Sequence, residues 1–204
     1  GELYIVNRNN GSFETYDING GTLAGPTTLN PALQNVASAV VSPDGKLILG
    51  SESADAIYEV EIASGNASPL AGEAITNMFG GDLLYGSDGV LYYASRPGGG
   101  QLINAMTNVS VGNLPNNVTG AALTSDGNIM TSSRNFSDLR VYGPQGSANE
   151  LAIYTTTLDG DPYPVAPSDL ASGCADTGGP QISFEGPCYP SELLAFEQGP
   201  NPNG

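Results

Sequence analysis

Short apolar segments alternate with polar turn residues along most of the chain. The clearest ones flank an Asp-Gly dipeptide, and they pair as Ala39–Val41 with Leu47–Leu49, Leu83–Tyr85 with Leu91–Tyr93, and Ala121–Leu123 with Ile129–Thr131. Asp-Gly between two β-prone segments is a strong hairpin signal, because the turn it favours needs positive φ at both central residues. The pattern therefore predicts three β-hairpins, which turn at Asp44-Gly45, Asp88-Gly89 and Asp126-Gly127.

The hairpins repeat along the chain, with steps of 44 and 38 residues between the Asp-Gly pairs. Counting back 44 residues from Gly45 reaches Gly1, so residues 2–6 are expected to be the second strand of the first unit. A further strand is predicted in each unit, followed by a weaker one, and these further strands lie at residues 13–18, 57–62, 101–103 and 139–142. No segment has a helical apolar stripe, and the tracts 30–38 and 148–151 can hold one helical turn at most.

Four short strands in a unit of about 40 residues describe the blade of a β-propeller. The predicted fold class is all-β: a β-propeller, or a propeller-like array of four-stranded blades, with a disulfide-pinned C-terminal extension. The blades are expected in residues 1–145, with repeats starting near 1, 45, 89 and 127. Residues 146–204 are expected to hold a degenerate last blade or closing strand and a Pro/Gly-rich linker. A longer chain with more blades is the alternative, because closed propellers usually hold about four to eight.

Two stretches carry a resemblance to a known group of proteins: SPDGKLILGSESADAIYEVEIASG at residues 42–65 and GELYIVNRNNGSFETYDINGG at residues 1–21. They resemble the repeats of secreted bacterial β-propellers of the YVTN, NHL and lactonase-like group, over residues 1 to about 145. The resemblance implies the propeller fold, which hosts lyases, lactonases, lectins and scaffolds. Its lactonase-like members use a metal held by Glu, Asn and Asp, and those ligands cannot be placed on residues of this chain. Residues 188–196 are similar to junctions in long surface proteins of Bacteroidetes-type bacteria.

The chain is strongly acidic, with 21 Asp and Glu against 5 Lys and Arg and a net charge of −16. So few cations cannot neutralise a run of phosphates, which excludes nucleic acid, and the same repulsion disfavours an anionic membrane surface. The sequence holds no histidine, which excludes a Ser-His-Asp triad, a Cys-His pair and a His-ligated zinc. No apolar run approaches the roughly 18–20 residues that span a bilayer, so no membrane insertion is expected.

Cys174 and Cys188 are the two cysteines, and they lie in a Gly- and Pro-rich stretch. We expect them to form a disulfide, which stabilises a loop of this size by about 3 kcal/mol. A redox or metal pair is the alternative, although the spacing is not Cys-x-x-Cys. A disulfide together with a Lys-poor, acidic composition predicts an extracellular or cell-surface location. Gly1 in place of an initiating Met is expected after removal of a leader peptide or within a longer chain.

Three arginines share one place in the repeat. Arg8, Arg96 and Arg134 each lie seven residues after the glycine of their unit, and Glu52 holds this place in the second unit. We call these four residues the rim row, since the ends of equivalent strands would put them on one face of a propeller. The alternative to a structural role is an anion or glycan-carboxylate site, because Arg offers a bidentate fork. The favoured interpretation is inter-blade pairing with acids at the same rim: Glu52, Asp55 and Asp138.

No metal site and no cofactor are predicted. Asp159 and Asp161 form an Asp-x-Asp pair. The repeating Asp44, Asp88 and Asp126 are explained by turn chemistry, because Asp tolerates left-handed φ. Calcium is kept as the alternative cofactor, since hard cations take such oxygen ligands, although no Asp-x-Asp-x-Asp-Gly loop is present.

Glycan attachment is the candidate modification. The Asn-x-Ser/Thr motif occurs at Asn10, Asn66, Asn108, Asn117 and Asn135. Each fits a surface loop, although such matches also arise by chance in an Asn/Ser/Thr-rich chain. Among the aromatic residues, Tyr163 and Tyr189 lie in Pro-rich loops and are nominated as contact residues.

The predicted function is non-enzymatic: an extracellular structural or adhesive module of a bacterial surface protein or filament. With no histidine and no nucleophile motif, no catalytic residue is assigned. A metal-dependent lactonase-like hydrolase and a glycan-binding lectin-type propeller are the alternatives. The expected partners are other copies of the chain, other domains of a larger surface protein, or glycans.

Residues 191–197 alternate enough to form a strand, and the first unit lacks its first strand. This segment could return to the first blade of its own chain and close the ring. It could instead pair with a neighbouring subunit by β-augmentation. A disordered tail is the third alternative, in keeping with the linker composition of residues 199–204.

Overall fold

The regular structure in the described residues consists of strands alone. The computed structural model describes residues 2–96, 99–124, 126–135, 138–143, 151–155, 157–158 and 161–162. These form one three-stranded and three four-stranded antiparallel sheets, which we call blades 1 to 4, and a short hairpin. The all-β prediction is thus confirmed. The disulfide predicted between Cys174 and Cys188 lies outside the described residues, as do Tyr163, Tyr189 and Asp159.

Each blade pairs its strands in chain order. Blade 1 holds β1 (Glu2–Val6), β2 (Phe13–Asp17) and β3 (Thr22–Thr27). Blade 2 holds β4 (Val36–Val41), β5 (Leu47–Ser51), β6 (Ala56–Glu61) and β7 (Asn66–Pro69). Blade 3 holds β8 (Gly81–Tyr85), β9 (Leu91–Ser95), β10 (Gln101–Asn104) and β11 (Val109–Asn113). Blade 4 holds β12 (Val118–Leu123), β13 (Ile129–Ser133), β14 (Asp138–Tyr142) and β15 (Ala152–Thr155), and the hairpin is β16 (Thr157–Leu158) with β17 (Asp161–Pro162).

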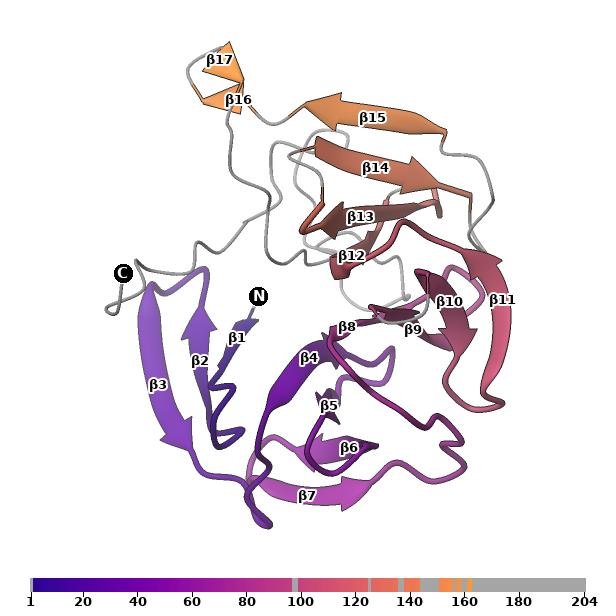
Figure 1. Cartoon of the computed structure of the whole chain (residues 1–204). Coiled ribbons are helices and arrows are strands. Elements are labelled where there is room, and N and C mark those ends of the chain that lie inside the picture. The colour runs from indigo at the N-terminus through magenta and orange to yellow at the C-terminus, as the bar shows by residue number, and fades with distance from the viewer. Residues whose placement is uncertain are drawn as a thin grey trace, which may run out of the picture.

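The blades stand around a common centre, as Figure 1 shows. The first strands β4, β8 and β12 lie toward the middle, and the last strands β7, β11 and β15 lie on the outside. β8 contacts both β4 and β12, so the inner strands of blades 2 to 4 are neighbours. Blade 1 begins directly with β1, which has the place that β5 has in blade 2. The strand prediction for residues 2–6 is therefore confirmed.

Alternation along a strand packs each blade against both of its neighbours. Leu47 and Leu49 of β5 join a buried cluster with Phe13 of blade 1. Ile48 lies between them in sequence and joins a cluster with Leu83 of blade 3. Successive side chains of a strand point to opposite faces, so β5, β9 and β13 are buried along their whole length. Full burial of one such side chain is worth about 1.5–3 kcal/mol, and these inter-blade layers form the core.

The Asp-Gly hairpins form as predicted, but their turn geometry differs from the expected one. Only the glycines have positive φ, at 83° for Gly45, 74° for Gly89 and 79° for Gly127. The Gly45 N–H donates to the Ser42 carbonyl at 2.9 Å, and the Ser42 N–H donates to the Lys46 carbonyl at 2.8 Å. This is a type I turn followed by a left-handed glycine, which accommodates Asp without left-handed φ.

Side-chain hydrogen bonds, and not tolerance of left-handed φ, therefore explain the Asp that repeats in these turns. The Ser42 hydroxyl donates to the Asp44 carboxylate and lowers the pKa of that group. In the third turn the Thr124 hydroxyl does the same for Asp126. The Asp side chain thus ties together the turn in which it stands.

The tract 30–38 holds no helical turn, and Val36–Ser38 already belong to β4. In the other tract, residues 148–150 lie outside the described residues. No helix in the described part of the chain is long and apolar enough to cross a membrane.

Candidate functional site

The rim row stands in equivalent loops. Arg8 follows β1, Glu52 follows β5, Arg96 follows β9 and Arg134 follows β13, and each opens the loop to the next strand of its blade. Because consecutive strands are antiparallel, this end is opposite to the Asp-Gly turns. The loops that lead from one blade to the first strand of the next arrive at this same end. We call it the rim face.

Two members of the rim row pair directly across a blade boundary. The Arg8 guanidinium donates from Nη2 to Glu52 Oε2 at 3.1 Å. The backbone supports the same boundary, since the Val36 N–H donates to the Arg8 carbonyl at 2.9 Å. Arg8 is 54% exposed and Glu52 17% exposed, so water screens this pair, which is worth at most about 1 kcal/mol. Asp55 forms no ion pair with an arginine among the described residues, and its Oδ1 accepts the Met78 N–H at 2.7 Å. The side chain of Asp138 lies outside the described set.

Arg96 lies against the backbone of Gly80, in the loop before β8. A Cβ built on Gly80 would be 3.1 Å from Arg96 Nη1 and 3.5 Å from Glu52 Oε1, so both side chains flank this glycine. The neighbouring Phe79 is 69% exposed. Tyr93 holds this loop, because its hydroxyl accepts the Phe79 N–H at 3.1 Å and donates to the Gly80 carbonyl. Arg96 and the exposed Phe79 thus both lie at the loop before β8, on the rim face.

Tyrosine titration gives a testable consequence of this packing. Burial raises the pKa of Tyr93 to about 12, with a further contribution from the Glu52 carboxylate. Burial also raises the pKa of Tyr4 and Tyr92 to about 12, aided by hydrogen bonds to Glu2 and Asp88. The folded protein therefore holds these protons more tightly than the unfolded chain, whose tyrosines titrate near 10.0. Stability is expected to be complete below pH 10 and to fall as pH rises from 10 to 12.

Ultraviolet absorption of tyrosinate measures this directly. We expect the tyrosines of the native protein to titrate in two steps, one near pH 10 and one near pH 12. The Tyr93→Phe variant should lose one tyrosine from the step near pH 12. A single transition near pH 10 in protein that is still folded by circular dichroism would contradict the burial of these hydroxyls.

Sequence reasoning missed the residues that hold the rim loops. Asn35 and Asn117 precede β4 and β12 and have positive φ, at 49° and 59°. The Asn35 carbonyl accepts the Glu52 N–H at 3.0 Å, and the Asn117 carbonyl accepts the Arg134 N–H at 3.2 Å. Gly80 takes the same place before β8, with φ of 62°. The repeated Asn-Val dipeptide at residues 35–36 and 117–118 was the signal that could have revealed this joint.

Asp82 is a second residue that the pattern did not reveal. It lies in the inner strand β8 and is only 4% exposed. Its Oδ1 accepts the Leu83 N–H and its Oδ2 accepts the Ala121 N–H of β12, both at 2.8 Å. The buried Asp82 side chain therefore joins the inner strands of blades 3 and 4 through hydrogen bonds from their backbone N–H groups.

Glu73 is the described carboxylate whose environment comes nearest to that of an acid–base group. It lies half-buried in the loop between β7 and β8. Burial is the main cause that raises its pKa, and the nearby Asp55 carboxylate adds to it. Its Oε1 is buried without a hydrogen-bond partner among the described residues. A carboxylate whose pKa is raised by burial and by a second carboxylate is a usual feature of acid–base sites.

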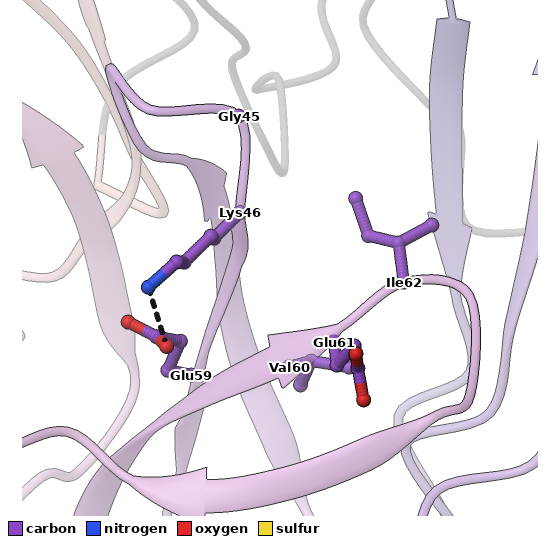
Figure 2. A pocket seen from close by; sticks show the side chains of 6 residues that line it. All are labelled: Gly45, Lys46, Glu59, Val60, Glu61 and Ile62. Atoms are coloured by element: carbon purple, nitrogen blue, oxygen red, sulfur yellow. Dashed lines mark hydrogen bonds and ion pairs between the residues drawn. The ribbon is translucent and has the colours of Figure 1, made fainter.

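The described residues contain no group of three or more His, Cys, Asp or Glu side chains placed to hold a metal ion. A hollow of about 320 Å³ lies at the Asp-Gly end of blade 2. Figure 2 shows Lys46 reaching from the turn toward Glu59, with Ile62 across the hollow. Lys46 Nζ lies 2.8 Å from Glu59 Oε1 and 3.6 Å from Asp44 Oδ2. The lining therefore pairs its one cation, Lys46, with Glu59, and the Glu61 carboxylate leaves the hollow with a net negative charge.

Four of the five glycosylation candidates, Asn10, Asn66, Asn108 and Asn135, are exposed, and Asn117 is half-buried. Asn117 Nδ2, the atom that a glycan would join, donates to Asn135 Oδ1 at 3.1 Å. Glycosylation stays a prediction for all five residues.

Comparison with known proteins finds similar folds among solved structures, but no matching sequence family. No family model matches the sequence, and no curated protein matches it. A streptogramin B lyase structure matches with 15% identity and a TM-score of 0.56, over 85% of this chain and 70% of that one. A protein named as a candidate gluconolactonase matches with 14% identity and a TM-score of 0.55, over 83% of this chain and 62% of that one. Virginiamycin B lyase from Staphylococcus aureus matches with 11% identity and a TM-score of 0.51, over 85% of this chain and 57% of that one.

At these identities the likeness shows the β-propeller fold alone. It agrees with the fold implied by the resemblance of the repeats to lactonase-like propellers. This chain spans between 57% and 70% of the length of these three neighbours.

Proposed function

We propose that this chain is a non-enzymatic extracellular module of a bacterial surface protein or filament, which adheres through its rim face. The ligand class is a short acidic glycan, because the net charge of −16 repels a long polyanion. Other copies of the chain or other domains of a larger surface protein are the further partners. Extracellular location rests on composition and on the predicted disulfide.

The proposal is supported by a difference between the cations and the carboxylates on the rim face: two arginines lack an ion-pair partner, whereas the carboxylates near them have partners. Arg96 and Arg134 form no ion pair with any residue that the structure describes. The carboxylates near them are engaged in the scaffold, since Glu52 pairs with Arg8 and Asp55 accepts a backbone N–H. Guanidinium groups that lack a partner can bind a carboxylate in a bidentate manner, and Phe79 offers an adjacent ring for a sugar face. A rigid array with such loops suits adhesion.

Binding of trigalacturonate tests the proposal, because a short oligomer limits the repulsion by the net charge of −16. We expect the chain to bind this uronic-acid oligomer and not neutral maltotriose, and Arg96→Ala and Arg134→Ala to weaken binding about tenfold each. Lys46→Ala is the matched control, since Lys46 lies at the opposite end of β5 and pairs with Glu59.

The rim proposal fails if the wild-type chain does not distinguish trigalacturonate from maltotriose. It also fails if Lys46→Ala weakens binding as much as Arg96→Ala does, because the effect would then follow net charge and not the rim.

A metal-dependent lactonase-like hydrolase is the second candidate. The neighbours in fold are named as lyases and a gluconolactonase, which leans against a purely non-enzymatic module without establishing catalysis. Within the chain, Glu73 with its raised pKa beside Asp55 is the pair that favours it. Lactone turnover that is abolished by a chelator and by Glu73→Gln, yet retained in Arg96→Ala, would replace the adhesive proposal with this one.

A further inference from the structure

Asn-Gly and Asp-Gly dipeptides are chemically reactive places in a protein chain. The glycine nitrogen can attack the side-chain carbonyl carbon of the preceding residue, because glycine has no side chain that hinders the approach. Five such dipeptides lie in the described residues: Asn10-Gly11, Asn19-Gly20, Asp44-Gly45, Asp88-Gly89 and Asp126-Gly127. Whether each can react depends on how the fold holds its glycine nitrogen.

In four of the five dipeptides the glycine nitrogen is bound within a turn. The Gly11 N–H donates to the Asn7 carbonyl at 2.8 Å. In the three Asp-Gly turns the glycine N–H donates at 2.9 Å to a carbonyl three residues earlier, with the pairs Gly45 to Ser42, Gly89 to Gly86 and Gly127 to Thr124. A nitrogen that donates in this way can attack only after the turn has opened locally, which slows the reaction.

The side chain of Asn10 is held as well. Its Oδ1 accepts the Ser12 N–H at 3.0 Å and the Ser12 hydroxyl at 2.8 Å. Gly11 is buried, and a Cβ built on it would lie 2.6 Å from Leu29 Cδ1. Leu29 belongs to a buried cluster. Asn10 and Gly11 therefore cannot rearrange without disturbing the core beside blade 1.

Asn19-Gly20 differs from the other dipeptides in exposure and in hydrogen bonding. It lies in the turn between β2 and β3, at the opposite end of blade 1 from the rim face, and both residues are exposed. The turn is closed by the Gly21 N–H, which donates to the Asp17 carbonyl at 2.8 Å, and by the Asn19 N–H, which donates to Asp17 Oδ1 at 2.9 Å. Neither the Gly20 N–H nor the Asn19 side chain forms a hydrogen bond with any described residue. The turn thus leaves both reacting groups unengaged.

We propose that Asn19 is a site of spontaneous deamidation, at which the Gly20 nitrogen closes a succinimide ring. The Gly20 nitrogen bonds to Asn19 Cγ, the Cγ–Nδ2 bond breaks, and the proton of the Gly20 N–H leaves with Nδ2 as ammonia. Water then opens the ring at either carbonyl and gives aspartate or isoaspartate. The product adds a negative charge two residues after Asp17, in a chain that already carries −16. The isoaspartate form also lengthens the backbone of the turn.

Peptide mapping by mass spectrometry of the full chain, aged in heavy-oxygen water, measures the reaction, because ring opening transfers one oxygen atom from water to the product. We expect Asn19 to deamidate about tenfold faster than Asn10 or more in the folded protein at mildly alkaline pH. In strong urea the two sites should react at similar rates, because the fold then protects neither of them.

Gly20→Ala is the matched variant. Gly20 has no left-handed φ, and the added Cβ would meet the end of the Asp17 side chain, at 2.6 Å from Oδ2, which can move aside. The methyl group crowds the attacking nitrogen, so deamidation of Asn19 should slow about tenfold. Deamidation of Asn10 in the same variant should keep its wild-type rate.

Equal rates at Asn10 and Asn19 in the folded protein would overturn the proposal. The same ratio of the two rates in urea as in the folded protein would also overturn it, since the neighbouring residues and not the fold would then set the difference. Equal rates at Asn19 in the wild type and in folded Gly20→Ala would show that the Gly20 nitrogen is not the attacking group. If Gly20→Ala does not fold, the comparison of folded and urea-treated wild type decides alone. None of these readouts involves the rim face, so this proposal and the adhesive function fail independently.

Discussion

Asp82→Ala is expected to lower the free energy of unfolding by about 3–5 kcal/mol. The variant leaves the Leu83 and Ala121 N–H groups without the carboxylate that they bond at 2.8 Å. Both groups lie between the inner strands of two blades, where water cannot replace the lost acceptor. Because Asp82 joins residues 39 positions apart, the loss should loosen blade 4 from blade 3. Urea unfolding followed by far-ultraviolet circular dichroism measures it, since the chain has no tryptophan.

Ser38 supplies the matched control for this prediction. It stands at the same register in blade 2, opposite Gly50, as Asp82 stands opposite Ala94. Its hydroxyl is buried without a hydrogen-bond partner among the described residues. Ser38→Ala is therefore expected to leave stability unchanged or to raise it by up to about 1 kcal/mol. If Asp82→Ala does not fold, Asp82→Asn keeps one acceptor and should still fold with a smaller loss. Equal stability of Asp82→Ala and Ser38→Ala would show that the carboxylate does not join the blades.

Gly81→Ala is expected to destabilise the protein by about 3 kcal/mol or more. Gly81 begins β8 with φ of 92°, a conformation that L residues rarely adopt. A Cβ at this position would lie 2.2 Å from the Ala94 carbonyl oxygen and 3.2 Å from the Tyr93 ring. The close atom is backbone, so relief requires β8 and β9 to separate. The variant should therefore also bring the pKa of Tyr93 down toward its ordinary value.

Gly45→Ala separates the steric effect from the backbone effect. Gly45 also has positive φ, at 83°, but a Cβ there would have no atom within 4 Å. Its cost is that of the left-handed conformation alone, about 1–2 kcal/mol. Urea unfolding of both variants gives the comparison. Similar losses for the two variants would refute the role assigned to the close approach at β8.

The sequence by itself determined the parts of this protein that depend on local pattern. Apolar segments around Asp-Gly predicted the hairpins β4–β5, β8–β9 and β12–β13, because turn and strand preferences act over a few residues. The step of 44 residues placed β1 as a second strand, and the common place of Arg8 and Glu52 put them in equivalent loops. These conclusions need only the order of residues and the periodicity of a strand.

Only the tertiary structure decided which of these residues contact one another. Leu47 and Ile48 are neighbours in sequence, yet they pack against different blades. Asp82 and Asp88 have the same side chain, but the first joins two blades and the second accepts a hydrogen bond from Tyr92 within its own hairpin. Contacts between residues about 40 positions apart depend on the distance and angle between successive blades. Short-range preferences do not contain this information. The packing of the blades therefore decides which hydrogen bonds join the inner strands and which partner each rim residue has.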